Sequence, residues 1–102
     1  MITTIQRLKE ENERLNHRAG HDWLTGLYDR EAAEEKINRL IQERGCGVMI
    51  LLDVDRFRRI NSRYGHIVGD HVLSSIAAVL DSMVFRHDVV GRVDDDEFVV
   101  FM

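Results

Sequence analysis

Carboxylate side chains occur at two places where the surrounding sequence predicts β-strands. Asp53 and Asp55 follow the apolar run at residues 48–52, and this run predicts a strand buried on both faces. Because side chains alternate along an extended chain, carboxylates at positions i and i+2 point the same way. Such a pair suits a hard cation such as Mg²⁺, which takes oxygen ligands and commonly shares them with phosphate. The alternative interpretation is a solvated acidic loop that follows a core strand.

The second acidic group lies between two β-rich runs near the C-terminus. Residues 89–102 read VVGRVDDDEFVVFM, which is typical of a β-hairpin with an acidic tip at residues 94–97. If this hairpin pairs with the strand at residues 48–54, then Asp53 and the tip lie at the same end of one sheet. Clustered carboxylates repel one another, so this arrangement favours a bound cation.

These segments resemble motifs of the GGDEF family, the diguanylate cyclases. The similar strings are DVDRFRRINSRYGHIVGD at residues 53–70 and GRVDDDEF at residues 91–98. A third string, DWLTGLYDR at residues 22–30, is similar to the family's D-x-L-T-x-L-x-N-R motif. Because the three motifs occur in the family's order and spacing, the chain is identified as a member. The resemblance implies an α+β, palm-like nucleotidyl-cyclase fold, in which helices pack on an antiparallel sheet.

The resemblance also implies a catalytic centre, because the family joins two GTP molecules into cyclic di-GMP. Asp53, Asp96 and the backbone carbonyl of Val54 would bind Mg²⁺, and Glu97 would support the catalytic centre. Arg58 stands where the family usually has lysine; it keeps the positive charge but changes the geometry of the contact.

The same resemblance implies that Asn61 and Asp70 bind the guanine base. An amide and a carboxylate can match the acceptor and donor atoms of the guanine edge. Asp94 and Asp95 replace both glycines of the family signature and would lie beside the substrate phosphates. Two unit charges about 4 Å apart repel by about 4 kcal/mol at an effective dielectric constant of 20. We therefore expect weak GTP binding or none.

Two further departures affect the expected activity. Phe85 occupies the arginine position of the family's R-x-x-D product-inhibition motif, so we expect that site to be absent. A complete family domain continues past the hairpin with more helix and strand, so the domain is expected to be truncated. Its missing strand would pair beside residues 48–54. We therefore expect that strand to be an open edge that a partner molecule or a rearranged segment covers.

Three functions are compatible with these observations. The leading hypothesis is a degenerate GGDEF domain that is inactive alone and acts in dimerisation or regulation of cyclic di-GMP signalling. A second is an active diguanylate cyclase of variant signature, seen as a fragment. A third is a module that binds GTP or guanine without turnover.

Composition narrows the class of protein. The chain has 102 residues, a 44% apolar fraction and a net charge of −4, which indicate one globular domain and no nucleic-acid partner. It has no apolar stretch long enough to span a bilayer. Cys46 is the only cysteine, so a disulfide framework is excluded and a cytoplasmic location is the default.

The chain divides into residues 1–20, predicted as an N-terminal helical stalk, and residues 21–102, predicted as a partial GGDEF domain. Ile5, Leu8, Leu15 and Ala19 occupy a and d positions of a heptad pattern, and Asn12 occupies the remaining a position. This pattern predicts a two-stranded coiled coil and hence a homodimer. The alternative is a solvated helix that packs on its own domain.

Three further helices are predicted. The first has Asp29 as its N-cap and ends at Gly45. A short helix follows Asp55, and Asp70 is expected to open a longer helix. The apolar stripe of that longer helix is Val72, Leu73, Ile76, Ala77, Leu80, Met83 and Val84. The helices are expected to cover one face of the sheet.

Overall fold

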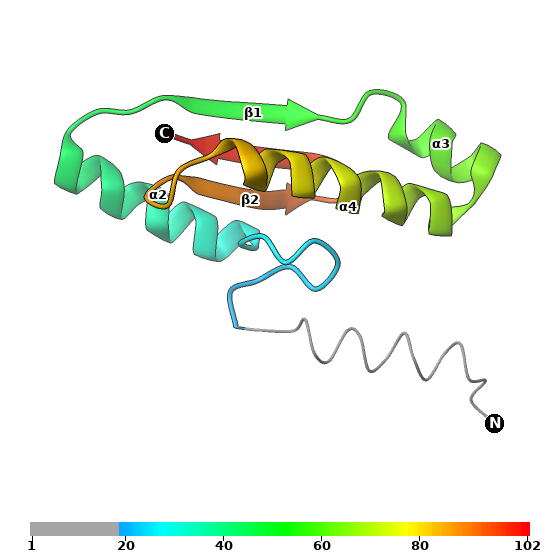
Figure 1. The fold of residues 1–102 in the computed structure, drawn as a ribbon, viewed down its shortest axis with the longest axis horizontal. Helices are drawn as coiled ribbons and strands as arrows, with labels where there is room; N and C mark the ends of the chain where they lie inside the picture. Colours follow the sequence, from blue (N-terminus) through cyan, green and yellow to red (C-terminus); the bar gives the residue numbers. More distant parts are fainter. Residues whose placement is uncertain (1–18) are drawn as a thin grey trace.

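The computed structural model describes residues 19–102, which form an α+β domain of helices and one antiparallel sheet (Figure 1). The predicted heptads of the stalk lie almost entirely outside the described residues. The elements are α2 (Arg30–Arg44), β1 (Met49–Asp53), α3 (Phe57–Tyr64), α4 (His66–Met83), β2 (Val89–Asp94) and β3 (Glu97–Phe101). Their order confirms the prediction for this part of the chain. None of these helices has the length and hydrophobicity needed to cross a membrane.

The three strands form one antiparallel sheet in the order β1-β3-β2. β2 and β3 form the predicted hairpin, and β3 pairs along its length with β1. The register places Asp53 opposite Glu97, so the end of β1 lies beside the start of β3. This confirms that the strand-end carboxylate and the hairpin tip share one end of the sheet.

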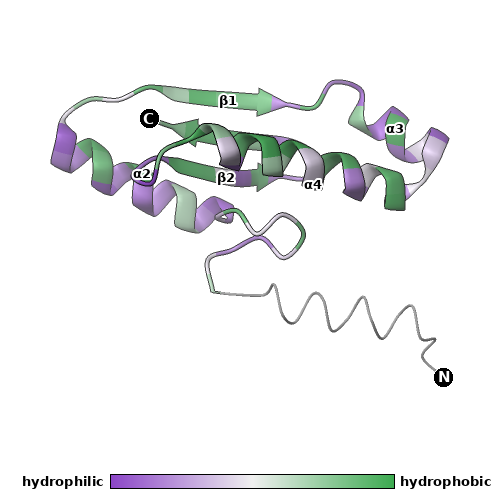
Figure 2. Cartoon of the chain, in the orientation of Figure 1, coloured by the Kyte–Doolittle hydropathy of each residue, from purple (hydrophilic) through white to green (hydrophobic). Residues whose placement is uncertain are grey.

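Helices pack on both faces of the sheet, and the prediction that they cover only one face is wrong. On one face, α3, α4 and the sheet bury Leu27, Phe57, Leu73, Ala77, Val90, Phe98 and Val100. On the other face, α2 and the sheet bury Ala33, Ile37, Val89, Val99 and Phe101. The reason is that successive residues of β3 point to opposite faces, and residues 98–101 are all apolar and buried. Figure 2 shows the largely hydrophobic strands of this sheet together with the mixed hydrophilic and hydrophobic residues of α2.

The ends of α2 follow local sequence signals as predicted. The side chain of Asp29 accepts a 2.9 Å hydrogen bond from the backbone N–H of Ala32. Gly45 adopts φ 77° and donates its N–H to the carbonyl of Ile41 at 2.7 Å. A side-chain N-cap and a left-handed glycine satisfy backbone groups that a helix end otherwise leaves unpaired.

The longer helix begins at His66 rather than at Asp70, which is a correction to the sequence prediction. Gly65 has φ 91°, ends α3 and directly precedes α4, so no separate loop is needed before Asp70. The predicted apolar stripe is confirmed at Leu73 and Ala77, whereas Met83 is 72% exposed at the end of the helix.

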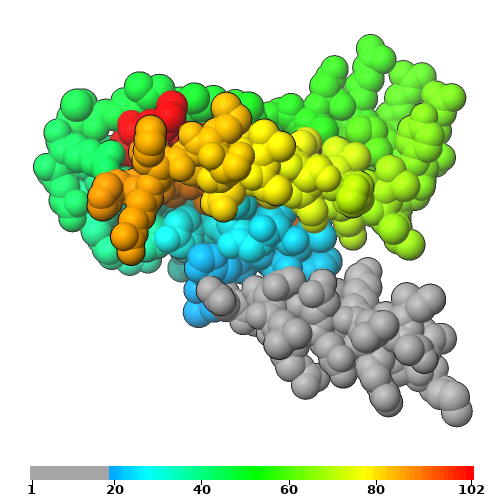
Figure 3. All heavy atoms as spheres, in the orientation of Figure 1, coloured from blue at the N-terminus to red at the C-terminus, as the bar shows by residue number. Residues whose placement is uncertain are grey.

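β1 is an outer strand, and the prediction that it is buried on both faces is wrong. Met49 and Leu51 are 58% and 68% exposed. Within residues 19–102, β3 is the only strand paired with β1, and α2 packs mainly over β2. The space-filling view shows α4 and the segment after it covering the sheet, with β1 along the rim (Figure 3).

Candidate functional site

The end of the sheet brings the predicted metal ligands together. The backbone N–H of Val54 donates a 2.9 Å hydrogen bond to the carbonyl of Asp96, which ties the residue after β1 to the hairpin turn. The pKa of Asp53 is raised, first because Asp96 hydrogen-bonds to its protonated form and repels its charged form. Asp55 and Asp94 add smaller repulsions. Asp53 and Asp96 are therefore near neighbours with like charge.

The donor set at this place fits Mg²⁺. Carboxylates and a backbone carbonyl are hard oxygen donors, and Mg²⁺ usually completes its shell with water and substrate phosphate. Among residues 19–102, no three His, Cys, Asp or Glu side chains are grouped closely enough to hold a metal by themselves. A cation here would therefore rely on Asp53, Asp96 and the Val54 carbonyl, together with ligands from a bound nucleotide.

The turn between β2 and β3 tolerates aspartate without backbone strain. In the described residues, Arg56 is the only non-glycine residue with positive φ, so Asp94, Asp95 and Asp96 all keep ordinary backbone angles. The backbone N–H of Asp95 donates to the Asp94 carboxylate at 2.8 Å, which closes the turn locally. Replacement of the signature glycines therefore acts through charge and bulk and leaves the hairpin intact.

An ion pair that the sequence analysis missed connects this turn to the N-terminal motif. The Nη1 atom of Arg92 lies 3.2 Å from both carboxylate oxygens of Asp22. Arg92 also donates from Nε and Nη2 to the carbonyl of Asp95, at 3.2 and 2.9 Å. Asp22 in turn accepts hydrogen bonds from Thr25. Arg92 is the one charged residue in the run at residues 89–93, and this was the sequence signal that could have indicated a buried ion pair.

A cavity of about 400 Å³ lies between α3 and the hairpin turn. Its lining residues are Phe57, Arg58, Asn61, Ser62, His66, Asp95 and Asp96. Asn61 lines this cavity, while its Oδ1 atom is buried against Gly69 of α4 and has no hydrogen-bond partner among the described residues. Gly69 on α4 makes this position possible, since a Cβ at Gly69 would collide with Asn61 Oδ1.

Asp70 lines a different cavity from Asn61. It borders a second space of about 290 Å³, together with Asp22, Trp23, Leu24 and residues 92–95. Asp95 lines both cavities. The structure thus brings Arg58 and Asn61 next to the acidic turn in one cavity, whereas Asp70 borders the other cavity.

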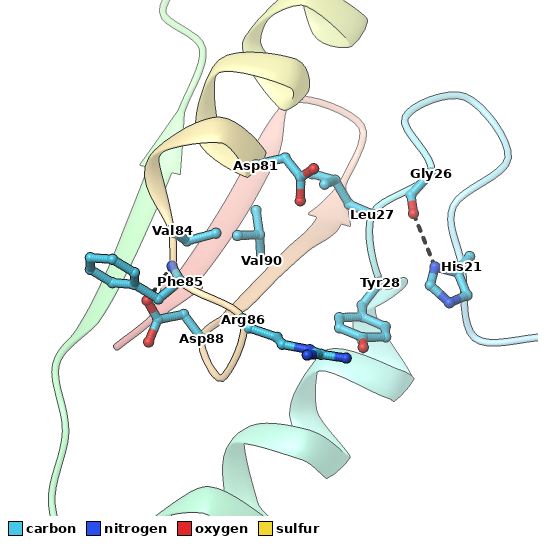
Figure 4. A pocket seen from close by; sticks show the side chains of 10 residues that line it. All are labelled: His21, Gly26, Leu27, Tyr28, Asp81, Val84, Phe85, Arg86, Asp88 and Val90. Carbon is cyan, nitrogen blue, oxygen red and sulfur yellow. Dashed lines mark hydrogen bonds between the residues drawn. The ribbon is translucent and has the colours of Figure 1, made fainter.

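A third cavity, of about 300 Å³, lies between the N-terminal loop and the segment that follows α4 (Figure 4). The predicted remnant of the product-inhibition motif borders it. Phe85 is 83% exposed, and its backbone N–H donates to the Asp88 carboxylate at 2.9 Å. Figure 4 shows Arg86 extending toward the ring of Tyr28.

The α+β fold and the acidic hairpin beside a strand-end carboxylate define a domain of the nucleotidyl-cyclase type. The model of the diguanylate cyclase GGDEF domain matches residues 19–102, and the chain belongs to this family. Diguanylate cyclase TpbB of Pseudomonas aeruginosa (strain PAO1) is 38% identical over 100 residues, which cover 94% of this chain. Diguanylate cyclase DgcM of Escherichia coli (strain K12) is 36% identical over 108 residues, covering 99% of this chain.

Solved structures agree with this assignment. The GGDEF domain of DgcB from Caulobacter crescentus, in complex with c-di-GMP, superposes with a TM-score of 0.77 at 28% identity. The match covers 84% of this chain and 51% of that one. The palm-like α+β fold predicted from the sequence is therefore confirmed. The chain spans 23% of TpbB and 25% of DgcM, about a quarter of these relatives' length.

Proposed function

We propose that this chain is a GGDEF domain that does not form cyclic di-GMP by itself and acts in dimerisation or regulation of cyclic di-GMP signalling. The observation that supports this proposal is the charge of the hairpin turn. Asp95 and Asp96 form a wall of the cavity next to Asn61, and Asp94 is adjacent to them. A triphosphate that approached this turn would meet carboxylates where the family signature has glycine.

The balance of charge in this cavity is unfavourable for a polyanion. Of the residues that line it, Arg58 has the one permanent positive charge and is exposed to solvent. Opposed to it are the Asp95 and Asp96 carboxylates. Each repulsion of a phosphate at about 4 Å is on the order of 1 to 4 kcal/mol between bulk water and a protein surface. Two such repulsions exceed the attraction from one exposed arginine.

The residues that would hold Mg²⁺ remain in place under this proposal. Bound between Asp53, Asp96 and the Val54 carbonyl, Mg²⁺ would neutralise charge on phosphoryl oxygens. Glu97 would lie beside that centre at the start of β3. Asn61 and Arg58 would orient a nucleotide from α3. Positioning of the triphosphate is the step that fails, because the carboxylates of the turn repel it before the reacting atoms can be aligned.

Binding of a guanine nucleotide without turnover is the second candidate function. The observation in its favour is the position of Asn61, which lines the cavity between α3 and the hairpin turn and carries an amide that can match the guanine edge. Titration of the chain with GTP and with guanosine separates this candidate from the first. Guanosine carries the base without the phosphates, so it should bind at least as well as GTP if charge repulsion limits binding.

Cyclase activity is tested by incubating the 102-residue chain with GTP and Mg²⁺ and measuring cyclic di-GMP. We expect no product at any concentration that permits dimers. If the unmodified chain forms cyclic di-GMP and the Asp96→Ala variant does not, the chain is an active cyclase of variant signature, as the names of TpbB and DgcM suggest.

We further propose a cytoplasmic location and homodimerisation through residues 1–20, based on the single cysteine and the heptad pattern.

A further inference from the structure

The amide of Asn61 on α3 is packed against the backbone of α4. Its Oδ1 atom is buried, and among the described residues it is the only buried side-chain oxygen or nitrogen without a hydrogen-bond partner. The atom lies where a Cβ of Gly69 would be. The ring of Phe57, one turn before Asn61, borders the same space, with its Cζ atom 3.3 Å from that place. The oxygen therefore packs between the two helices without a polar partner.

The chemistry of this contact favours oxygen over nitrogen at the buried position. In glycine a hydrogen atom stands in the place of Cβ, so a Cα–H group of Gly69 points at Oδ1. Such a group forms a weak hydrogen bond with an amide oxygen. An –NH₂ group in the same position would bury two donors that have no acceptor, which is costly. Asn61 therefore keeps its oxygen on Gly69 and turns its nitrogen away from it.

The Nδ2 group of Asn61 faces the cavity between α3 and the hairpin turn. Asn61 lines this cavity although its Oδ1 is buried, so Nδ2 is the polar atom that it presents there. No hydrogen bond between described residues uses Nδ2, and this atom is not among those buried without a partner. The nitrogen is therefore accessible and free to donate to a ligand.

The other polar groups of the cavity wall differ from this donor. Arg58 carries a permanent positive charge, and Asp95 and Asp96 carry carboxylates. The hydroxyl of Ser62 donates to a backbone carbonyl of its own helix at 3.4 Å. Asn61 supplies the one amide of the wall, and a neutral donor can fix the orientation of an uncharged ring that charge alone does not orient.

We propose that Gly69 is a positioning residue for this cavity: its missing side chain lets Asn61 bury Oδ1 and present Nδ2 to a bound base. The inference rests on the second candidate function, binding of a guanine nucleotide, and adds the residue that sets the direction of the hydrogen bond. Acceptors such as O6 or N7 of guanine would receive this bond. Gly69 does not line the cavity and acts through Asn61.

A methyl group at position 69 should displace the Asn61 amide. Because Oδ1 is the far end of a side chain, rotation of Asn61 removes the collision more readily than separation of α3 from α4. The rotated amide no longer holds Nδ2 toward the cavity. Gly69→Ala should therefore weaken guanosine binding by about five- to tenfold, which is typical of one lost hydrogen bond.

Calorimetric titration with guanosine tests the proposal through a double-mutant cycle. Asn61→Ala should weaken binding to a similar degree, and Gly69→Ala should have no further effect in that background, because both changes remove the same donor. Gly47→Ala is the matched control. Its Cβ would meet the ring of Phe101 at the end of the sheet away from the turn, so guanosine affinity should be unchanged.

Three results of this titration would overturn the proposal. Gly69→Ala might weaken binding equally in both backgrounds, which is the behaviour of a residue that only supports the fold. It might leave the affinity of the otherwise unmodified chain unchanged. Gly47→Ala might weaken binding as much as Gly69→Ala, which would assign the loss to general destabilisation.

NMR of the ligand-free chain separates the positioning role from the binding function. The Nδ2 proton signals of Asn61 should shift in Gly69→Ala and stay in place in Gly47→Ala. If the unmodified chain binds no guanosine, nucleotide binding fails as a function, and this measurement still decides the role of Gly69. Strong NOEs from the Nδ2 protons to the Gly69 Hα protons would show that the amide is reversed, and unshifted signals in Gly69→Ala would show that Gly69 does not orient it.

Discussion

Asp22 and Arg92 form an ion pair across 70 positions of the sequence, with Arg92 Nη1 lying 3.2 Å from each oxygen of Asp22. The Arg92 and Asp22 side chains are only 13% and 16% exposed, respectively, so water screens the pair poorly. The same guanidinium donates two hydrogen bonds to the carbonyl of Asp95 in the hairpin turn. The pair therefore fixes the N-terminal loop to the turn that bounds the candidate nucleotide site.

Loss of this arginine should destabilise the domain. Arg92→Met keeps a long side chain but leaves the Asp22 carboxylate and the Asp95 carbonyl without their donor, so we expect a loss of about 2 kcal/mol in the free energy of unfolding. Urea denaturation measures it. Arg30→Met is the matched control, because the Arg30–Glu34 pair is exposed and its loss should change stability by less than about 1 kcal/mol. Equal effects of the two variants would contradict a structural role for the Asp22 pair.

Gly69 is expected to resist replacement because of Asn61. Gly69→Ala should lower the free energy of unfolding by about 1–3 kcal/mol, since the added methyl group collides with Asn61 Oδ1 in the packed space between α3 and α4. The double variant Asn61→Ala, Gly69→Ala should recover most of this loss. A double-mutant cycle by thermal unfolding provides the measurement, and simple additivity of the two changes would show that the two residues are not in conflict.

Divalent cations should stabilise the folded chain through Asp53 and Asp96. Mg²⁺ at about ten times its dissociation constant should add about 1.4 kcal/mol, because it relieves the repulsion between the two carboxylates. Differential scanning calorimetry with and without MgCl₂ measures the shift, with KCl of equal ionic strength as the salt control. Asp53→Asn and Asp96→Asn should each reduce the Mg²⁺ response. A response unchanged in both variants would place the cation elsewhere.

Removal of charge from the hairpin turn should strengthen nucleotide binding. Asp94→Asn and Asp95→Asn should each improve GTP affinity by roughly tenfold at low ionic strength, and by less at 0.5 M salt because of screening. Isothermal titration calorimetry measures both affinities. Asp81→Asn, at the far end of α4, makes the same change in net charge and should have little effect. An equal gain in the Asp81 variant would show that net charge, and not the turn, limits binding.

Local chemistry allowed much of the fold to be predicted from the sequence. Asp29 caps α2 and Gly45 ends it, because an N-cap carboxylate and a left-handed glycine act on the nearest backbone groups. Two β-rich, mainly apolar runs on either side of residues 94–97 specified the hairpin, and three motifs in order specified the family. The caps and the hairpin depend on residues within a few positions of each other, and the motifs are read directly from residue order, so the sequence alone determined them.

Burial and long-range pairing were decided by the tertiary structure. The apolar run at residues 48–52 has the composition of a buried strand, but its exposure depends on whether a neighbour lies on its outer side. The ion pair of Asp22 with Arg92, and the contact of Asn61 with Gly69, form only when separate elements pack together. Asn61 and Asp70 line different cavities, both of which Asp95 borders. Sequence spacing determines which groups are present, and three-dimensional packing determines which of them meet.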